Sequence, residues 1–406
     1  MAKPRSDTSA RADTGNRLEP DNLELLRELS SRLGWRMTMR TVSAPHVRDA
    51  NNIDRLLNRF IVATVPCWLI GMWNVGEQIA VGMQIAGIRN LSGWRAELVE
   101  GIGLPIDPEN ILSCWLHGFL YFLPIFLTSL IIGVLWEILF AANRKRPLDE
   151  GVLSIAWLFA LILPPTATFF QVIYGMTAAM VIGKLIFGGT GRYLVSPVIL
   201  GICVLFFSYS SVLHGPEVWI PLAGYQEPTT LELAILEGGV PALISVDYSW
   251  WLLFLGNQPG PFGVTSALGC LLGAAYLLAT GSASWRIMAG SLVGLVVTVS
   301  LVALVAPAEA VGMNMPWYWH MVLGGWAFGT VFLATDPTAA ATTRTGRWAF
   351  GILVGVVTVI VRLTNPAYFE GVIFAILLAS IFAPLCDHFV VEQNIKRRRA
   401  RLEKKQ

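Results

Sequence analysis

The sequence predicts an all-α, polytopic membrane protein with about ten transmembrane helices. Hydrophobic residues make up 54% of its 406 residues and charged residues only 14%, whereas a soluble domain carries roughly 25% charged residues. The apolar residues also gather in long stretches that contain almost no charge. Because backbone groups cannot stay unpaired in lipid, we expect these stretches to be helices.

Ten segments are apolar enough to cross a bilayer. The hydrocarbon core is about 30 Å thick and requires roughly 20 mostly apolar residues in a helix. The predicted spans lie near residues 57–76, 117–141, 152–168, 170–187, 195–210, 263–281, 285–306, 319–335, 347–363 and 369–389. We expect Pro164-Pro165 to form a short turn between the third and fourth spans.

The distribution of Lys and Arg predicts the orientation of these spans. Cytoplasmic loops are enriched in Lys and Arg. The segment 211–250 contains neither residue and is therefore assigned to the outside, and only Arg89 and Arg95 of the first outside loop oppose the trend. With both termini in the cytoplasm, the basic clusters all fall inside: residues 143–146, 184–192, 285–286, 344–347 and the tail from 396.

Three regions follow from this assignment. Residues 1–55 are polar, contain no apolar signal-peptide core and are predicted to form a cytoplasmic extension. Residues 56–390 form the transmembrane domain, and residues 391–406 form a basic cytoplasmic tail. Five spans in each half would give the halves opposite orientations, so we expect two inverted five-helix repeats.

Several classes of function are disfavoured by what the sequence lacks. A net charge of +2 gives no reason to expect a nucleic-acid partner. The five cysteines occur singly and no CxxC is present, so we expect no metal centre or iron–sulfur cluster within this chain. There is also no Walker A motif and no GxGxxG after a strand, so any nicotinamide chemistry should take place on another chain.

Ionisable residues at span ends are the first candidates for function. Glu137, Asp336 and Asp387 lie toward the cytoplasmic ends of predicted spans, and carboxylate oxygens suit a hard cation such as Na⁺. The alternative is that each acid lies at a wet interface or caps a helix. For Lys184 and His388 the wet interface is the preferred interpretation.

Glycines cluster between the fourth and fifth spans, in Gly188-Gly189-Thr190-Gly191-Arg192. Glycine allows a backbone to approach a ligand or another helix closely. A glycine-rich loop beside an arginine is compatible with phosphate binding. Packing of helices through small residues is the preferred explanation.

Several motifs in order along residues 45–406 resemble one family, the B-type membrane subunit of the sodium-translocating NADH:quinone reductase. They include His46-Val47-Arg48-Asp49, Phe187 to Arg192, Ser284-Trp285-Arg286-Ile287, Met315 to His320, Ala334-Thr335-Asp336-Pro337, Arg344 to Gly351, Asn365-Pro366-Ala367-Tyr368 and Asp387 to Arg398.

The resemblance implies a membrane subunit of a multisubunit translocase that is not active alone. Such a complex passes electrons from NADH to ubiquinone and exports Na⁺ across the bacterial inner membrane. In this family the B-type subunit carries covalent FMN and riboflavin. The other subunits, membrane lipid, ubiquinone and Na⁺ are therefore the expected partners.

The family attaches FMN through a phosphoester to a threonine in the motif Asp-Gly-Tyr-Ser-Gly-Ala-Thr-x-Leu. Here the matching segment is Ala223-Gly224-Tyr225-Gln226-Glu227-Pro228-Thr229-Thr230-Leu231. The resemblance implies that Thr229 is the FMN acceptor, with Thr230 as a second candidate. The Asp and the Ser-Gly-Ala run are absent, which bears on recognition by the attaching enzyme.

The resemblance also extends to the motifs around Glu137, Asp336 and Asp387, which we expect to take up Na⁺ from the cytoplasmic side. Gly151, next to a basic inside loop, is a candidate for the entry of a quinone headgroup.

Two alternatives remain. One is the D-type subunit of an Rnf-type ferredoxin:NAD⁺ oxidoreductase, which shares the fold and the flavin threonine. The other is a flavin-free channel or transporter with inverted repeats. The long N-terminal extension and the tail from Asp387 favour the B-type subunit of the quinone reductase.

Overall fold

The computed structural model describes residues 52–406 apart from 89–90, 92, 102, 105–106, 146, 210–212, 214, 223, 308–311, 366–369 and 404–406. All regular elements within these ranges are helices and none is a strand, which confirms the all-α prediction. Residues 1–51 of the predicted extension, and Ala223 of the flavin motif, lie outside the described residues.

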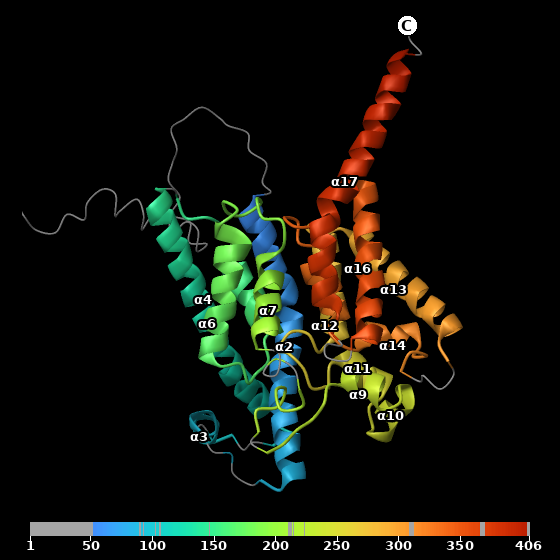
Figure 1. Ribbon diagram of the computed structural model, residues 1–406. Helices are drawn as coiled ribbons and strands as arrows, with labels where there is room; N and C mark the ends of the chain where they lie inside the picture. The colour runs from blue at the N-terminus through green and yellow to red at the C-terminus, as the bar shows by residue number, and fades with distance from the viewer. Residues whose placement is uncertain are drawn as a thin grey trace, which may run out of the picture.

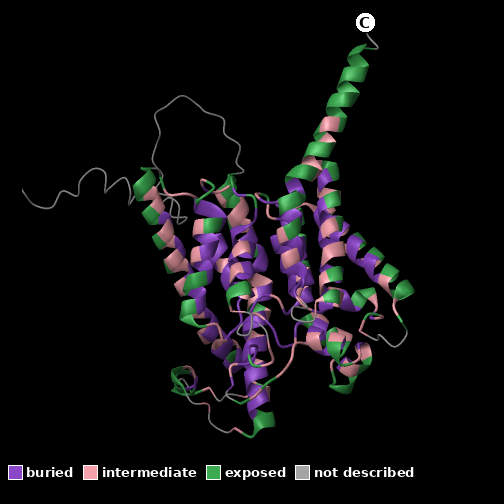
Figure 2. Cartoon of the chain, viewed as in Figure 1, coloured by how far each residue is buried: buried purple, intermediate pink, exposed green. Residues whose placement is uncertain are grey.

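Five helices are long and apolar enough to cross a membrane: α2 (Ile53–Ala86), α4 (Ile111–Arg144), α13 (Trp285–Val305), α16 (Arg344–Thr364) and α17 (Val372–Glu403). With 34, 34 and 32 residues, α2, α4 and α17 exceed the roughly 20 residues that a bilayer requires. The surplus in α17 projects past the helix bundle and is largely exposed (Figures 1 and 2).

The outer faces of these helices are themselves apolar. Along α4, Leu127, Ile131, Leu135 and Leu139 recur every four residues, and each is between 43% and 64% exposed. In a soluble protein such a stripe would face the core. Here it faces outward, where lipid would cover it.

Glycines bring α2 and α4 into close contact. A Cβ atom on Gly76 of α2 would lie 1.9 Å from the Cys114 carbonyl oxygen, and one on Gly118 of α4 would lie 2.0 Å from the Met72 carbonyl oxygen. Neither position can hold a side chain without separating the helices. Such close approach is typical of helix packing in membranes.

The third predicted span, 152–168, is shorter than expected. Its helix, α5 (Val152–Ile162), ends before the Pro164-Pro165 pair because a residue preceding proline disfavours helical backbone and Leu163 is extended. The chain resumes as α6 (Phe169–Ala178), which continues into the π-helix η1 (Ala179–Leu185). Two further apolar helices are similarly short, α7 (Pro197–Ser208) and α12 (Ala267–Ala279).

The eighth predicted span, 319–335, is interrupted. It consists of α14 (Trp317–Val322), α15 (Trp326–Phe328) and the π-helix η2 (Gly329–Leu333), with a break at residues 323–325. The Arg362 guanidinium donates hydrogen bonds to the carbonyls of His320 (2.8 Å) and Leu323 (2.9 Å). Glu370 accepts one from the Gly325 amide at 2.7 Å. Charged side chains thus satisfy backbone groups that the break leaves unpaired.

The segment predicted as a long loop has structure of its own. It contains α9 (Thr230–Leu236), α10 (Val240–Ser245) and the start of α11 (Trp250–Leu255), packed around a small core that includes Leu231, Leu243 and Trp319. These helices and α3 (Trp94–Gly101) lie at the end of the molecule opposite the one from which α17 emerges (Figure 1). We refer to these as the α9 end and the α17 end.

Candidate functional site

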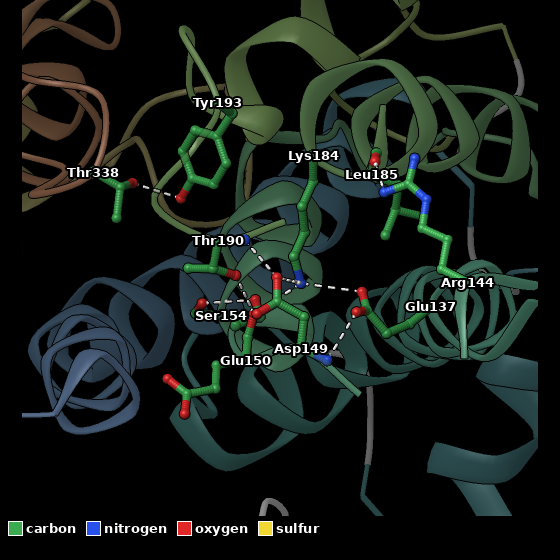
Figure 3. Close-up of polar contacts among 11 residues, drawn as sticks. Glu137, Arg144, Asp149, Glu150, Ser154, Lys184, Leu185, Thr190, Tyr193 and Thr338 are labelled. Carbon is green, nitrogen blue, oxygen red and sulfur yellow. Dashed lines mark hydrogen bonds and ion pairs between the residues drawn. The ribbon is translucent and has the colours of Figure 1, made fainter. Parts of the chain in front are cut away.

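A buried lysine organises a polar network near the α17 end. Lys184 of η1 is fully buried, and its Nζ donates to Glu137 Oε2 of α4 at 3.0 Å and to the Glu150 carbonyl at 2.8 Å. Asp149 Oδ2 lies 3.5 Å from the same nitrogen. We call Lys184, Glu137, Asp149, Glu150 and Thr190 the Lys184 network (Figure 3). The wet-interface interpretation is therefore wrong for Lys184, because two helices and the loop before α5 enclose its ammonium group.

Glu137 has both carboxylate oxygens engaged and is only 4% exposed. Oε2 accepts from Lys184, and Oε1 accepts from the Asp149 backbone amide at 3.0 Å. Removing one partner of such a buried pair typically costs about 3–5 kcal/mol, because the other charge stays buried without compensation. Glu137 is thus a structural partner of Lys184 in this structure, whatever further role it has.

The glycine-rich loop holds a carboxylate of the chain itself. The Thr190 amide donates to Asp149 Oδ2, and Thr190 Oγ1 donates to the Glu150 carbonyl at 2.5 Å. Gly189 has φ +107°, and a Cβ there would lie 2.4 Å from Asp149 Oδ2. Burial alone would raise the pKa of Asp149, but Lys184 and the Thr190 hydrogen bonds lower it below its usual value. The space that sequence reasoning considered for a phosphate is therefore occupied by Asp149.

Two hollows adjoin the Lys184 network. One of about 710 Å³ is lined by Glu137, residues 148–154, and apolar side chains of α2 and α4 that include Leu57, Leu130 and Val134. The second, of about 460 Å³, shares Leu57, Gly151 and Ser154 with the first and extends to Asp336. Gly151 stands where the two meet, with φ +91° and Leu57 Cδ1 only 2.8 Å from the position of a Cβ atom.

Asp336 lies on the far side of the second hollow. Its Oδ1 accepts from the amide of Thr338 at 3.0 Å and from its hydroxyl at 2.5 Å, and Thr338 also contacts the Tyr193 hydroxyl (Figure 3). Desolvation raises the pKa of Asp336, and the hydrogen bonds from Thr338 offset part of this effect. Glu137 and Asp336 therefore line neighbouring hollows without touching one another.

Asp387 belongs to a different contact. From α17 it accepts four hydrogen bonds, at 2.6–2.9 Å, from the amides and hydroxyls of Thr342 and Thr343 at the start of α16. A Cβ on Gly346 would lie 2.5 Å from Asp387 Oδ1, which explains the glycine at this position. The third predicted acid thus ties two helices together. His388, next to it, is exposed.

At the α9 end the two candidate threonines differ sharply. Thr229 caps the N-terminus of α9, accepts a hydrogen bond from the Glu232 amide at 3.2 Å and is partly exposed. No described residue accepts a hydrogen bond from its hydroxyl. Thr230 is 2% exposed, and its hydroxyl donates to Gln258 Oε1 at 2.6 Å. Only Thr229 offers an accessible hydroxyl.

Thr229 and Thr230 both border a hollow of about 260 Å³ that is also lined by Gln258, Pro259 and Gly260. Pro261, Val264 and Glu370 are shared with a larger, mostly apolar hollow of about 580 Å³. The larger hollow lies between the end of the short third span and the interrupted eighth span. Its walls include residues 162–164 of the former, and Gly325 and Phe328 of the latter. The smaller hollow, which begins at Thr229, therefore adjoins the larger apolar one.

The residues that replace the family's Ser-Gly-Ala run are held within their own loop. Glu227 accepts hydrogen bonds from the hydroxyls of Tyr225 (3.1 Å) and Tyr248 (2.7 Å), and its amide donates to the Pro216 carbonyl. Gln226 is hydrogen bonded to Glu217. Partial burial and the nearby Glu227 carboxylate raise the pKa of Tyr225 to about 12, so this tyrosine remains a donor at neutral pH. These hydrogen bonds therefore fix the segment that precedes Thr229.

Three features were missed from the sequence. The pairing of Lys184 with Glu137 was signalled only by the presence of a lysine inside an apolar segment. The link between Gln258 and Thr230 had no sequence signal. Cys67 and Cys270, which appear isolated in sequence, have sulfur atoms 3.7 Å apart in the core. Among the described residues, no three or more His, Cys, Asp or Glu side chains form a group able to hold a metal ion.

Comparisons with known proteins agree with the motifs. The profile of the NQR2, RnfD, RnfE family matches residues 40–396. The protein named as the B-type subunit of Na(+)-translocating NADH-quinone reductase in Azotobacter vinelandii is 45% identical over 365 residues, covering 89% of this chain and 90% of the relative. Proteins of the same name are 44% identical in Chromohalobacter salexigens, covering 89% and 87%, and 42% identical in Pseudomonas aeruginosa, covering 89% and 90%.

Proposed function

The chain belongs to the NQR2, RnfD, RnfE family, and we propose that it is the B-type subunit of a Na⁺-translocating NADH:quinone reductase. The observation that carries the proposal is the match over about nine tenths of both chains to bacterial proteins of that name. The Rnf-type alternative belongs to the same family profile. The quinone reductase is favoured because the relatives that are 42–45% identical to this chain are named as subunits of that enzyme.

The arrangement of helices supports ten membrane crossings. The five long helices, the four shorter apolar ones and the interrupted segment α14–η2 supply them. The short helix α5 and the interrupted segment α14–η2 then fall in the third and eighth crossings, which are equivalent positions in two inverted five-helix halves. In this arrangement residues 56–390 form the membrane domain of a bacterial inner-membrane protein. The extension 1–55, the tail 391–406 and the α17 end face the cytoplasm, and the segment 211–250 faces outward.

We expect Thr229 to carry the covalent FMN through a phosphoester. The fit rests on its partly exposed side chain and on the two adjoining hollows, the larger of which has mostly apolar walls that suit a flavin ring. FMN supplies electron transfer when bound, while the protein sets its position and environment. Gln258, Pro259 and Gly260 would line its attachment point. The riboflavin implied for this family is part of the proposal, without residues assigned to it.

Gly151 marks the proposed quinone site. The hollow of about 710 Å³ combines apolar walls from Leu57, Leu130 and Val134 with backbone and acidic groups from the loop before α5, the mixture of lining groups that small-molecule sites use. The Lys184 network fixes that loop. A quinone headgroup entering here would therefore meet a wall held rigidly by buried charge.

Glu137, Asp336 and Asp387 remain the proposed acids of the Na⁺ pathway. Replacing each with its amide should raise the Na⁺ concentration needed for half-maximal turnover of the complex. Glu137→Gln should be combined with Lys184→Met, because the single change removes the closest carboxylate from a fully buried ammonium group. Unchanged Na⁺ dependence in all these variants would remove the acids from the pathway.

The deciding experiment for the flavin is peptide mass spectrometry of residues 211–250, prepared from membranes that contain the assembled complex. We expect a mass increase equal to an FMN phosphoester, localised to Thr229. An unmodified peptide would rule out covalent attachment and favour a bound flavin without a covalent link. A colourless complex would instead support the flavin-free transporter.

A further inference from the structure

Two adjacent threonines stand at the proposed attachment point, and one buried side chain distinguishes them. We propose that Gln258 determines which threonine receives the flavin, by engaging the Thr230 hydroxyl and leaving Thr229 free. This inference rests on the proposed flavin attachment. It assigns a specificity-determining role to a residue that lies 28 positions from Thr230 in the sequence.

The orientation of the Gln258 amide follows from its partners. Its Nε2 donates to the carbonyls of Thr265 (2.7 Å) and Val322 (3.3 Å). Backbone carbonyls only accept hydrogen bonds, so the nitrogen has to face them and Oε1 has to face Thr230. The Thr230 hydroxyl must therefore act as the donor, and its proton is committed to the amide oxygen at 2.6 Å.

Gln258 is itself held by a second amide. Asn74 of α2 donates through Nδ2 to the Gln258 carbonyl at 2.8 Å and accepts the Gln258 backbone amide through Oδ1 at 3.2 Å. Asn74 is 1% exposed and Gln258 is 3% exposed. The side chain thus starts from a fixed backbone position, and water does not compete for its hydrogen bonds.

This arrangement matters for the attachment chemistry. The threonine oxygen has to attack the flavin-side phosphorus of an activated flavin nucleotide such as a flavin dinucleotide. The Oγ1–P bond forms, the pyrophosphate P–O bond breaks, AMP leaves and the hydroxyl proton passes to a base. The reaction requires an accessible oxygen and a hydroxyl proton that can pass to the base. Thr230 meets neither requirement, because its oxygen is buried and its proton is donated to Gln258 Oε1. Thr229 meets both with a partly exposed hydroxyl that only accepts.

The test uses the assembled complex and fragmentation mass spectrometry that separates Thr229 from Thr230. In a Thr229→Ala background with Gln258 intact, we expect no flavin on Thr230. Adding Gln258→Met, which keeps the length but neither accepts nor donates, should release the Thr230 hydroxyl and place flavin on it. Losing one hydrogen bond should raise the population of Thr230 hydroxyl groups that are free to react about fivefold.

Two controls separate selection from loosening of the fold. Gln258→Glu keeps an acceptor for Thr230 but removes the amide donors to Thr265 and Val322, so flavin should stay off Thr230. Gln78→Met removes another buried amide, which donates to Asn257 Oδ1 at 2.8 Å without touching Thr230. With this change, flavin attachment should remain confined to Thr229.

Each outcome decides the matter. Flavin on Thr230 with Met but not with Glu at position 258 supports the proposal. Flavin on Thr230 with both, or with neither, overturns it. An unmodified wild-type Thr229 would overturn the attachment and, with it, the selection that rests on it.

Discussion

The two ends of the molecule hold their functional loops by different means. At the α17 end, Lys184 joins two carboxylates and a carbonyl from separate segments, and the loop before α5 is fixed by buried charge. At the α9 end, Gln258, Asn74 and Thr230 connect their segments through neutral amides and a hydroxyl. Removing one partner of a buried ion pair leaves an uncompensated charge. The loss of one hydrogen bond by a neutral amide destabilises the fold less. The first network suits a rigid wall, and the second suits a choice between two hydroxyl groups.

The largest expected effect comes from removing the buried ammonium group. Lys184→Met leaves Glu137 and Asp149 without their cation, and we expect a loss of about 3–5 kcal/mol of stability. Heat inactivation of the detergent-solubilised complex would measure it. The double variant Glu137→Gln/Lys184→Met should recover part of the loss.

A matched surface control exists in the tail. Lys396 pairs with Glu392 at 2.8 Å, but its side chain is 73% exposed. Lys396→Met should therefore leave stability nearly unchanged, because exposed ion pairs contribute little. Equal losses at Lys184 and Lys396 would contradict the distinction between the two environments.

The second prediction concerns Arg362, a buried charge at the break after α14. Arg362→Met removes the two charged hydrogen bonds that cap the break after α14, at 2.8 and 2.9 Å. We expect a loss of about 3 kcal/mol, since hydrogen bonds to charged groups exceed neutral ones and the carbonyls stay buried. The same heat inactivation, run beside Lys184→Met, would rank the two. A greater loss of stability than in Lys184→Met would mean that the α9 end, and not the α17 end, depends more on buried charge.

The sequence predicted much of this architecture because lipid imposes a strong pattern. The apolar lengths located α2, α4, α13, α16 and α17, and Pro164-Pro165 marked the end of the third span. The predicted span 319–335 continued through the break at residues 323–325 because the flanks of the break are as apolar as a continuous helix.

The sites were less predictable, for a physical reason. Thr229 came from a motif, which records chemistry at neighbouring positions. The partners of Lys184 and Thr230 lie 47 and 28 residues away, and only the packing of helices brings them together. The carboxylates at Glu137 and Asp387 were expected to be available to ions, but their hydrogen-bond partners come from other segments and left no trace in the local sequence.

A third prediction concerns the glycine loop of the Lys184 network. Gly189→Ala imposes a left-handed conformation on alanine and also places Cβ against the Asp149 carboxylate, whereas Gly191→Ala, at φ +82°, meets no atom within 4 Å. Both should cost about 1 kcal/mol from backbone strain, and Gly189→Ala should cost more through the clash. We expect only Gly189→Ala to raise the KM for quinone, because Asp149 lines the hollow of about 710 Å³. Equal KM values for the two variants would mean that this loop does not contribute to quinone binding.

Among the variants that remove a buried polar contact, the smallest effect should come from the neutral network. Thr230→Val keeps the shape of the side chain but removes the hydroxyl that donates to Gln258 Oε1, leaving a buried acceptor without its partner. We expect a loss of about 1–2 kcal/mol, well below that of Lys184→Met. Flavin on Thr229 should be retained in full, because Thr229 caps α9 independently of its neighbour. Heat inactivation and the flavin content of the same preparation would measure both quantities. A loss of flavin together with stability would mean that the amide network positions Thr229 as well as withholding Thr230.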